Sequence, residues 1–241
     1  MLFIGNLKSY VTTQEYIDTL TSYTFQDEVW LALPLVYIYK YGQKLTSANI
    51  KVGSQCVDLE EDFSNRGETF AKMLKDVGTQ FVFLGQHKDK KPTNADFNRL
   101  RKKIASIISN GMCAVVSVGE TMEESETGKL YQVVERQIKE IFKGLNCAYN
   151  ENNLIIAYEP KWLIGTGLSI CTPQLEIIIR NIKSMIEVYG GGNYKLLFGG
   201  SCNVDNMPLY SSVAGIDGFV MSTATRDVKQ FVRILCGVKK R

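Results

Sequence analysis

Short apolar runs recur along the whole chain, and polar residues or glycine bound each of them. They are rich in Val, Ile, Leu and Phe and are too short for helices, a pattern typical of parallel β-strands buried on both faces. The runs cover residues 2–5, 29–33, 50–53, 81–84, 113–118, 154–158, 195–198 and 218–221. We predict a strand in each of these eight places.

Longer stretches between the runs have the apolar periodicity of amphipathic helices. The clearest cover residues 67–77, 95–109, 129–142, 173–188 and 226–235. Thr172 followed by Pro173 predicts a helix N-cap and a first-turn proline. Strands that alternate with helices in this way indicate βαβ units and a parallel sheet.

The number of repeats favours one closed architecture. Eight strand–helix repeats in 241 residues predict an α/β fold, a single (β/α)8 TIM barrel whose one domain covers residues 1–241. An open doubly wound sheet is the alternative. Such sheets often carry a glycine-rich turn after the first strand, and the sequence Gly-Asn-Leu-Lys at residues 5–8 does not match G-x-G-x-x-G.

Charge and cysteine content argue against several classes of protein. The net charge of +3 is too small to favour a nucleic-acid or membrane partner. Six scattered cysteines and one histidine predict neither a metal cluster nor a disulfide framework. The apolar run at residues 1–5 is too short for a signal peptide, and no segment has the roughly 18 apolar residues of a membrane span. We therefore expect a reduced, cytoplasmic protein.

Barrel enzymes carry their chemistry at the C-terminal ends of the strands, so the residues that follow each run are candidates for the site. Asn6 and Lys8 follow the first run two residues apart, and extended backbone would point both side chains into the same mouth. A lysine there would supply positive charge for an anionic substrate. The alternative is an ordinary solvated lysine in a loop.

A glutamate ends the sixth apolar run. Glu159 is followed by Pro160, which sets the direction in which the chain leaves. A carboxylate among apolar neighbours has a raised pKa, which suits a general base near neutral pH. The lid segment, residues 162–167 with the sequence W-L-I-G-T-G, is apolar and rich in glycine, as expected of a loop that closes over a ligand. A capping glutamate before an ordinary loop is the alternative, but Trp and Ile are costly to expose.

Small residues follow the last two runs. Gly199, Gly200 and Ser201 would let backbone N–H groups and a hydroxyl approach an anion. Ser222 and Thr223 lead into the final helix, whose N-terminus favours negative charge. Loops seven and eight form the usual phosphate site of such barrels, so a small phosphorylated substrate is predicted.

Taken together, these residues resemble the triosephosphate isomerase family in order, spacing and strand position along nearly the whole chain. Residues 157–167 (AYEPKWLIGTG) are similar to the active-site motif of that family. Further matches lie at residues 6–8 (N-x-K), 53–55 (G-S-Q), 73–78 (M-L-K-D-x-G), 117–120 (S-V-G-E) and 199–201 (G-G-S).

The resemblance implies interconversion of dihydroxyacetone phosphate and D-glyceraldehyde 3-phosphate through an enediolate, as in glycolysis and gluconeogenesis. No metal or organic cofactor and a homodimeric assembly are implied with it. Glu159 would move the proton, Lys8 would offset the phosphate and enediolate charge, and Asn6 would donate to a substrate oxygen. The phosphate would be held by Gly165, Ser201 and the backbone at Ser222 and Thr223.

One departure from the family falls on a catalytic position. Gln86 stands where the family has its catalytic histidine, and His87 beside it would point to the other face of the strand end. A glutamine can donate a neutral N–H to the substrate oxygen, but it cannot pass a proton between the two oxygens. Because a lost acid–base partner typically lowers the rate about 10²–10⁴-fold, we expect reduced activity.

Other departures concern the dimer and the phosphate site. Lys88 replaces an acidic residue and Arg66 replaces a threonine that reaches across the family's dimer interface, which puts that contact in doubt. Ser222 and Thr223 replace a pair of glycines, so either would be strained if its φ were positive.

Two further hypotheses compete with the isomerase. One is a catalytically inactive barrel that binds a phosphometabolite or a protein partner, motivated by the loss of the histidine, the glycine pair and the interface threonine. It gives no reason for Glu159 and the lid segment to persist. The other is an isomerase for a different small phosphate, which the close match of the lid segment disfavours.

Overall fold

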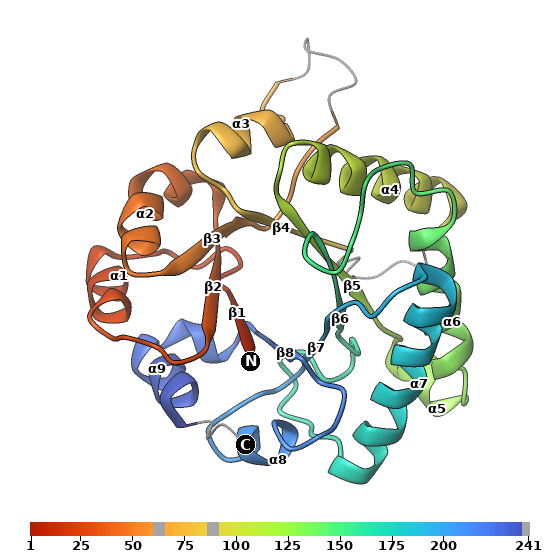
Figure 1. Cartoon of the computed structure of the whole chain (residues 1–241). Helices are drawn as coiled ribbons and strands as arrows, with labels where there is room; N and C mark the ends of the chain where they lie inside the picture. Colours follow the sequence, from red (N-terminus) through yellow and green to blue (C-terminus); the bar gives the residue numbers. More distant parts are fainter. Residues whose placement is uncertain (60–65, 86–91, 238–241) are drawn as a thin grey trace.

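The computed structural model describes residues 1–59, 66–85 and 92–237. Eight parallel strands close into a barrel in sequence order, with β1 pairing both β2 and β8 (Figure 1). The strands are β1 (Leu2–Asn6), β2 (Glu28–Leu33), β3 (Ile50–Ser54), β4 (Phe81–Leu84), β5 (Cys113–Val118), β6 (Leu154–Tyr158), β7 (Leu196–Gly199) and β8 (Gly218–Met221). The predicted (β/α)8 barrel is confirmed, and the open doubly wound alternative is wrong.

Helices surround the barrel and cover the outer face of its strands (Figure 1). They are α1 (Gln14–Thr21), α2 (Leu35–Ser47), α3 (Ala71–Asp76), α4 (Asn94–Ser109), α5 (Met122–Glu126), α6 (Leu130–Phe142), α7 (Thr172–Gly190), α8 (Met207–Tyr210), the 3-10 turn η1 (Ala224–Arg226) and α9 (Val228–Gly237). Their apolar faces and the outward strand residues form the larger buried cluster.

Three helix starts differ from the sequence prediction. Helix α3 begins at Ala71 and not near residue 67, because Thr69 and Phe70 are extended and pair with Asp58. Thr172 is the first residue of α7 and not its N-cap; Cys171 occupies that place, and its side chain caps no backbone N–H. The last helix is divided because Asp227 is extended and its carboxylate accepts the Lys229 N–H at 2.8 Å.

Alternate strand residues point into the barrel and form a second, smaller buried cluster. Its members are Leu2, Ile4, Trp30, Ala32, Phe81, Phe83, Cys113, Val115, Ile155, Ala157, Leu197 and Val220. Because side chains alternate with a period of two, the next inward positions are Asn6 on β1, Ser117 on β5, Glu159 after β6 and Gly199 on β7. The packed interior therefore ends in a polar layer at the C-terminal mouth.

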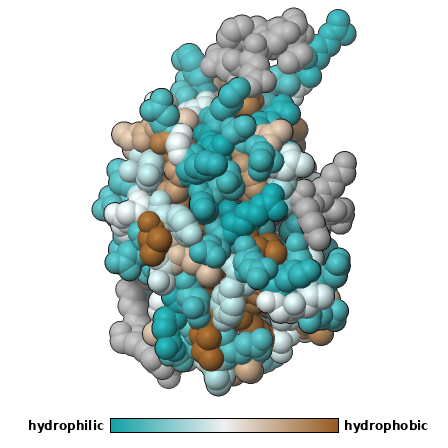
Figure 2. All heavy atoms as spheres, turned by 90° about the vertical axis from the view of Figure 1, so that its right-hand side faces the viewer, coloured by the Kyte–Doolittle hydropathy of each residue, from teal (hydrophilic) through white to brown (hydrophobic). Residues whose placement is uncertain are grey.

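Figure 2 shows the side of the barrel on which α4, α6 and α7 lie, and hydrophilic residues cover most of it. Apolar residues appear there as separate small groups. In the described ranges, no helix is long and apolar enough to cross a membrane.

Candidate active site

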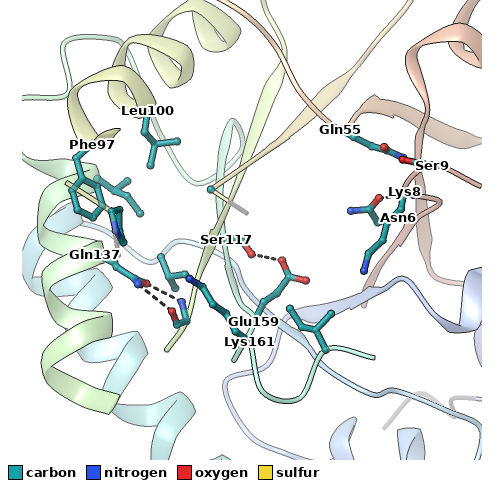
Figure 3. A pocket seen from close by; sticks show the side chains of 16 residues that line it. Asn6, Lys8, Ser9, Gln55, Phe97, Leu100, Ser117, Gln137, Glu159 and Lys161 are labelled. Atoms are coloured by element: carbon teal, nitrogen blue, oxygen red, sulfur yellow. Dashed lines mark hydrogen bonds between the residues drawn. The ribbon is translucent and has the colours of Figure 1, made fainter. Parts of the chain in front are cut away.

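A cavity of about 440 Å³ opens at the mouth of the barrel, where the strands end. Asn6, Lys8 and Gln55 line one side of it, Phe97 and Leu100 line the other, and Glu159 lies between them (Figure 3). The cavity therefore brings an amide, an ammonium group and a carboxylate from distant parts of the sequence to one place.

Asn6 and Lys8 are held in a constrained turn at the end of β1. The Asn6 side chain is buried, and its Oδ1 accepts the Lys8 backbone N–H at 2.9 Å. Lys8 has φ +47°, and Asn49 is the other non-glycine residue with positive φ among those described. Such a conformation is unfavourable for a residue with a Cβ, and strain of this kind is often found at functional sites. The backbone thus holds Lys8 in a set position at the cavity.

The loop after β8 supports this turn. The buried Thr225 hydroxyl lies 3.2 Å from the Asn6 carbonyl oxygen and 2.5 Å from the Ser222 carbonyl oxygen. Thr223 has φ −63°, and Ser222 is not among the residues with positive φ. Ser222 and Thr223 replace two glycines of the family, and the backbone strain that a positive φ would have caused there is therefore absent.

Glu159 is almost fully buried, with 4% of the residue exposed. The Ser117 hydroxyl donates to its carboxylate (Figure 3), and its backbone N–H donates to the Val118 carbonyl at 2.8 Å. A Cβ on Gly199 would lie 2.5 Å from Glu159 Cγ, so only glycine leaves room for this carboxylate. Neighbouring strands on both sides thus define where the carboxylate lies.

The end of β5 is fixed beside Glu159. A Cβ on Gly119 would lie 2.2 Å from the Glu159 carbonyl oxygen, so glycine is required for this close approach. The Gln137 side-chain amide accepts the Gly119 N–H at 2.8 Å and donates to the Gly119 carbonyl at 3.0 Å. Helix α6 therefore anchors the backbone that carries Ser117.

The lid segment lies against the loops after β7 and β8. Ser201 donates to the Leu163 carbonyl at 2.6 Å and accepts the Gly167 N–H at 3.2 Å. A Cβ on Gly165 would lie 3.8 Å from the Thr223 hydroxyl oxygen, and Gly165 has φ +71°. The residues predicted to bind phosphate do not line the 440 Å³ cavity. They lie where the lid segment meets these two loops, and they are Gly165, Ser201, Ser222 and Thr223.

A buried carboxyl group anchors the start of the lid segment. Glu120 is fully buried and accepts the Trp162 indole N–H at 2.8 Å and the Tyr158 hydroxyl at 3.2 Å. Its carbonyl accepts the Lys161 N–H at 2.9 Å. Burial raises the pKa of Glu120, and the hydrogen bonds from Trp162 and Tyr158 oppose that increase.

This raised pKa makes the contribution of Glu120 to stability depend on pH. A carboxyl with a raised folded-state pKa contributes stability below its unfolded pKa, and the contribution is lost as pH rises through the folded value. Glutamine cannot ionise. We therefore expect the stability of Glu120→Gln relative to wild type, measured as the free energy of unfolding, to increase from about pH 5 to about pH 8. Urea unfolding at both pH values measures this, with the exposed Glu176→Gln as control; a pH-independent difference for Glu120→Gln would contradict it.

The structure places three of the four predicted catalytic residues, Asn6, Lys8 and Glu159, around the same cavity. The fourth, Gln86, lies outside the described residues, as do His87 and Lys88. Arg66 is described and is exposed.

Five polar residues that line the cavity were given no role from the sequence. They are Ser9, Gln55, Ser117, Gln137 and Lys161. The period of two from Val115 could have revealed Ser117, since it points to the same side of β5. Gln137 gave no such signal, because its role depends on a contact between α6 and the end of β5.

Comparison with known proteins agrees with this arrangement. The sequence profile of the family described as triosephosphate isomerase matches residues 1–238. The chain belongs to the triosephosphate isomerase family. Proteins named triosephosphate isomerase from Legionella pneumophila (strain Lens), Aquifex aeolicus and Alkaliphilus oremlandii are 31%, 29% and 28% identical to it. The alignments cover 96%, 95% and 97% of this chain and 93%, 94% and 98% of those proteins.

Proposed function

We propose that this member of the family interconverts dihydroxyacetone phosphate and D-glyceraldehyde 3-phosphate by proton transfer through an enediolate. The observation that carries the proposal is the convergence of Glu159, Lys8 and Asn6 on one cavity, in a chain of the triosephosphate isomerase family. A buried carboxylate, a fixed ammonium group and an amide are the groups that proton abstraction next to a carbonyl requires.

The proposed reaction moves one proton between two carbons. The Glu159 carboxylate removes a proton from C1 of dihydroxyacetone phosphate, and the C–H electron pair forms the enediolate double bond. Glu159 then returns the proton to C2. The C1 hydroxyl gives up its proton and becomes the aldehyde carbonyl, and O2 takes up a proton to become the hydroxyl of the product. Lys8 offsets the negative charge on the enediolate oxygens and the phosphate, and Asn6 donates to a substrate oxygen. Gln86 donates a neutral N–H to the substrate oxygens in the histidine's place.

Phosphate binding is assigned to the region where the lid segment meets loops seven and eight. Gly165, Ser201 and the backbone at Ser222 and Thr223 are proposed to hold the phosphate. The contacts of Ser201 with Leu163 and Gly167 support this, because they link the lid segment to the loop that would meet the anion. No cofactor or metal is required by this chemistry.

We further propose that residues 1–241 act as one domain, in the cytoplasm, as a homodimer. Val11, Val36 and Tyr39 are 78%, 79% and 85% exposed, which supports a surface covered by a second copy. Their segments are adjacent, since the Tyr41 hydroxyl donates to the Thr12 carbonyl at 3.2 Å. Arg66 and Lys88 would alter the contacts of such a dimer relative to the family.

Steady-state kinetics with both triose phosphates, on wild type and Gln86→His, tests the proposal. We expect measurable turnover by wild type and about 10²-fold or greater acceleration by the histidine, which restores the acid–base partner. Tight binding of phosphoglycolate, a mimic of the enediolate, is expected with it. No turnover by either protein would overturn the proposal, and phosphoglycolate binding without turnover would favour the non-catalytic barrel.

A further inference from the structure

We propose that the cavity holds a second ligand site at Lys161, which takes the carboxylate of a small organic acid with an apolar or aromatic body. The site is the α4–α6 pocket, the part of the cavity lined by Phe97, Leu100, Val118, Gln137, Ile141 and Lys161. It lies across the cavity from Asn6 and Lys8 (Figure 3). The proposal goes beyond the isomerisation, because such an acid needs neither Glu159 nor the phosphate loops to bind.

The walls of the α4–α6 pocket are apolar. Phe97 and Leu100 on α4 and Ile141 on α6 belong to the buried core, and all three also face the cavity. Pockets for small molecules typically combine such walls with a small number of polar groups. A strongly hydrated group would lose its water against these side chains without compensation, whereas an aromatic ring or a short aliphatic chain would not.

Two arginines tie α4 to α6 around the pocket. The Arg101 guanidinium lies 3.4 Å from the Glu140 carboxylate, and Arg136 donates to the Pro92 carbonyl at 2.9 Å. The Arg136 guanidinium also lies over the Phe97 ring, 5.8 Å from its centroid. These contacts form the pocket without a ligand, so that binding needs little further ordering of side chains.

The backbone fixes Lys161 at the mouth of this pocket, immediately before the lid segment. Its N–H donates to the Glu120 carbonyl at 2.9 Å. The preceding residue, Gly119, exchanges hydrogen bonds of 2.8 and 3.0 Å with the Gln137 side-chain amide. From this point the Lys161 side chain extends toward Gln137 (Figure 3). Lys161 therefore brings an ammonium group to the α6 side of the cavity.

The ammonium group of Lys161 forms no ion pair within residues 1–59, 66–85 and 92–237. The neighbouring carboxylates, Glu120 and Glu159, accept hydrogen bonds from other side chains. Lys161 is half-buried, and a charge beside apolar walls attracts an opposite charge more strongly than it does in water. A ligand carboxylate would supply the missing partner.

The charges around the cavity favour a monocarboxylate. Among the described residues that line it, the cations are Lys8 and Lys161 and the anion is Glu159. Lys8 offsets the substrate charge in the proposed reaction, which leaves one positive charge on the α4–α6 side. One carboxylate matches that charge, whereas a phosphate dianion would need a second cation. An acid bound there lies in the same cavity as Glu159 and inhibits the isomerisation, a consequence that rests on the proposed function.

Titration calorimetry with benzoate on the full chain tests the site. We expect saturable binding, with acetate, which lacks the apolar body, and benzyl alcohol, which lacks the charge, binding at least about tenfold more weakly. Lys161→Met keeps the length of the side chain and should weaken benzoate binding at least about tenfold, while Lys161→Arg should recover most of the affinity. Lys129→Met removes an exposed ammonium group at the start of α6 and should leave the affinity unchanged.

Thermal unfolding shows whether each variant folds, and Lys161→Gln replaces the methionine variant if that variant does not. Equal benzoate affinity in wild type and in the uncharged variant would overturn the proposal. Equal affinity for benzoate and benzyl alcohol, or no saturable benzoate binding, would overturn it too. The titration contains no substrate, so a lack of isomerase turnover would contradict the proposed function and leave the benzoate result to decide this proposal. If the protein is active, benzoate should inhibit it, and an active enzyme that binds benzoate without inhibition would overturn the placement of the site.

Discussion

Replacing Glu159 with glutamine is expected to lower kcat by about 10³-fold in both directions of the isomerisation, with KM changed little. Glutamine matches the size of glutamate, so it fits the same position against Gly199 and within hydrogen-bond reach of Ser117. It has no basic oxygen, and the proton on the substrate carbon then has no acceptor of suitable strength. Binding should persist because Lys8 and the phosphate loops are intact. Steady-state kinetics with each triose phosphate measures the change.

The matched control is Glu187→Gln, which removes a carboxylate from the exposed face of α7. It should leave kcat and KM at their wild-type values. A Glu159→Gln variant that keeps more than about a tenth of wild-type kcat would contradict the assignment of Glu159 as the base, because general-base catalysis contributes at least about 10²-fold.

Replacing Lys8 with methionine is expected to lower kcat/KM by about 10²–10³-fold and to weaken phosphoglycolate binding. Two unit charges about 4 Å apart at a partly buried site attract by about 4 kcal/mol, and the proposed role of the ammonium group is to offset the charge of the phosphate and of the developing enediolate. Methionine keeps the length of the side chain without its charge. The unfavourable φ of +47° is equally unfavourable for lysine and methionine, so the substitution isolates the charge.

Two measurements complete this test. Lys72→Met removes an ammonium group from the exposed surface of α3, where its ion pair with Asp76 spans 3.9 Å, and it should change neither kinetics nor phosphoglycolate affinity. Calorimetry on Lys8→Met should show phosphoglycolate affinity reduced at least about tenfold. Unchanged affinity would mean that Lys8 does not face the substrate's negative charge.

The strands and the mouth residues were predictable because both follow from short-range patterns. A parallel strand buried on both faces is an uninterrupted apolar run, and the run's end marks the edge of the barrel. The position after such runs therefore predicted Asn6, Lys8 and Glu159 as site residues. All three line one cavity in the structure. The family motif around Glu159 added the reaction, which no apolar pattern could supply.

The remaining features depend on contacts between distant segments. The late start of α3 results from pairing of Thr69 and Phe70 with Asp58, which the helical periodicity of residues 67–77 does not reveal. The structure adds a second reason for glycine at position 199, because the Glu159 side chain lies against it. The hydroxyl of Ser201 contacts the lid segment, and that of Ser117 contacts the base. Such side-chain partners become visible only once the strands are placed in register.

Hydrogen exchange tests most directly whether Glu159 transfers a carbon-bound proton of a substrate bound in the cavity. Wild-type protein incubated with dihydroxyacetone phosphate in D₂O should incorporate deuterium at C1, followed by NMR, and form glyceraldehyde 3-phosphate. Glu159→Gln should incorporate about 10³-fold more slowly. Binding of the substrate without any exchange into its carbon-bound positions, or equal exchange in wild type and Glu159→Gln, would contradict the account.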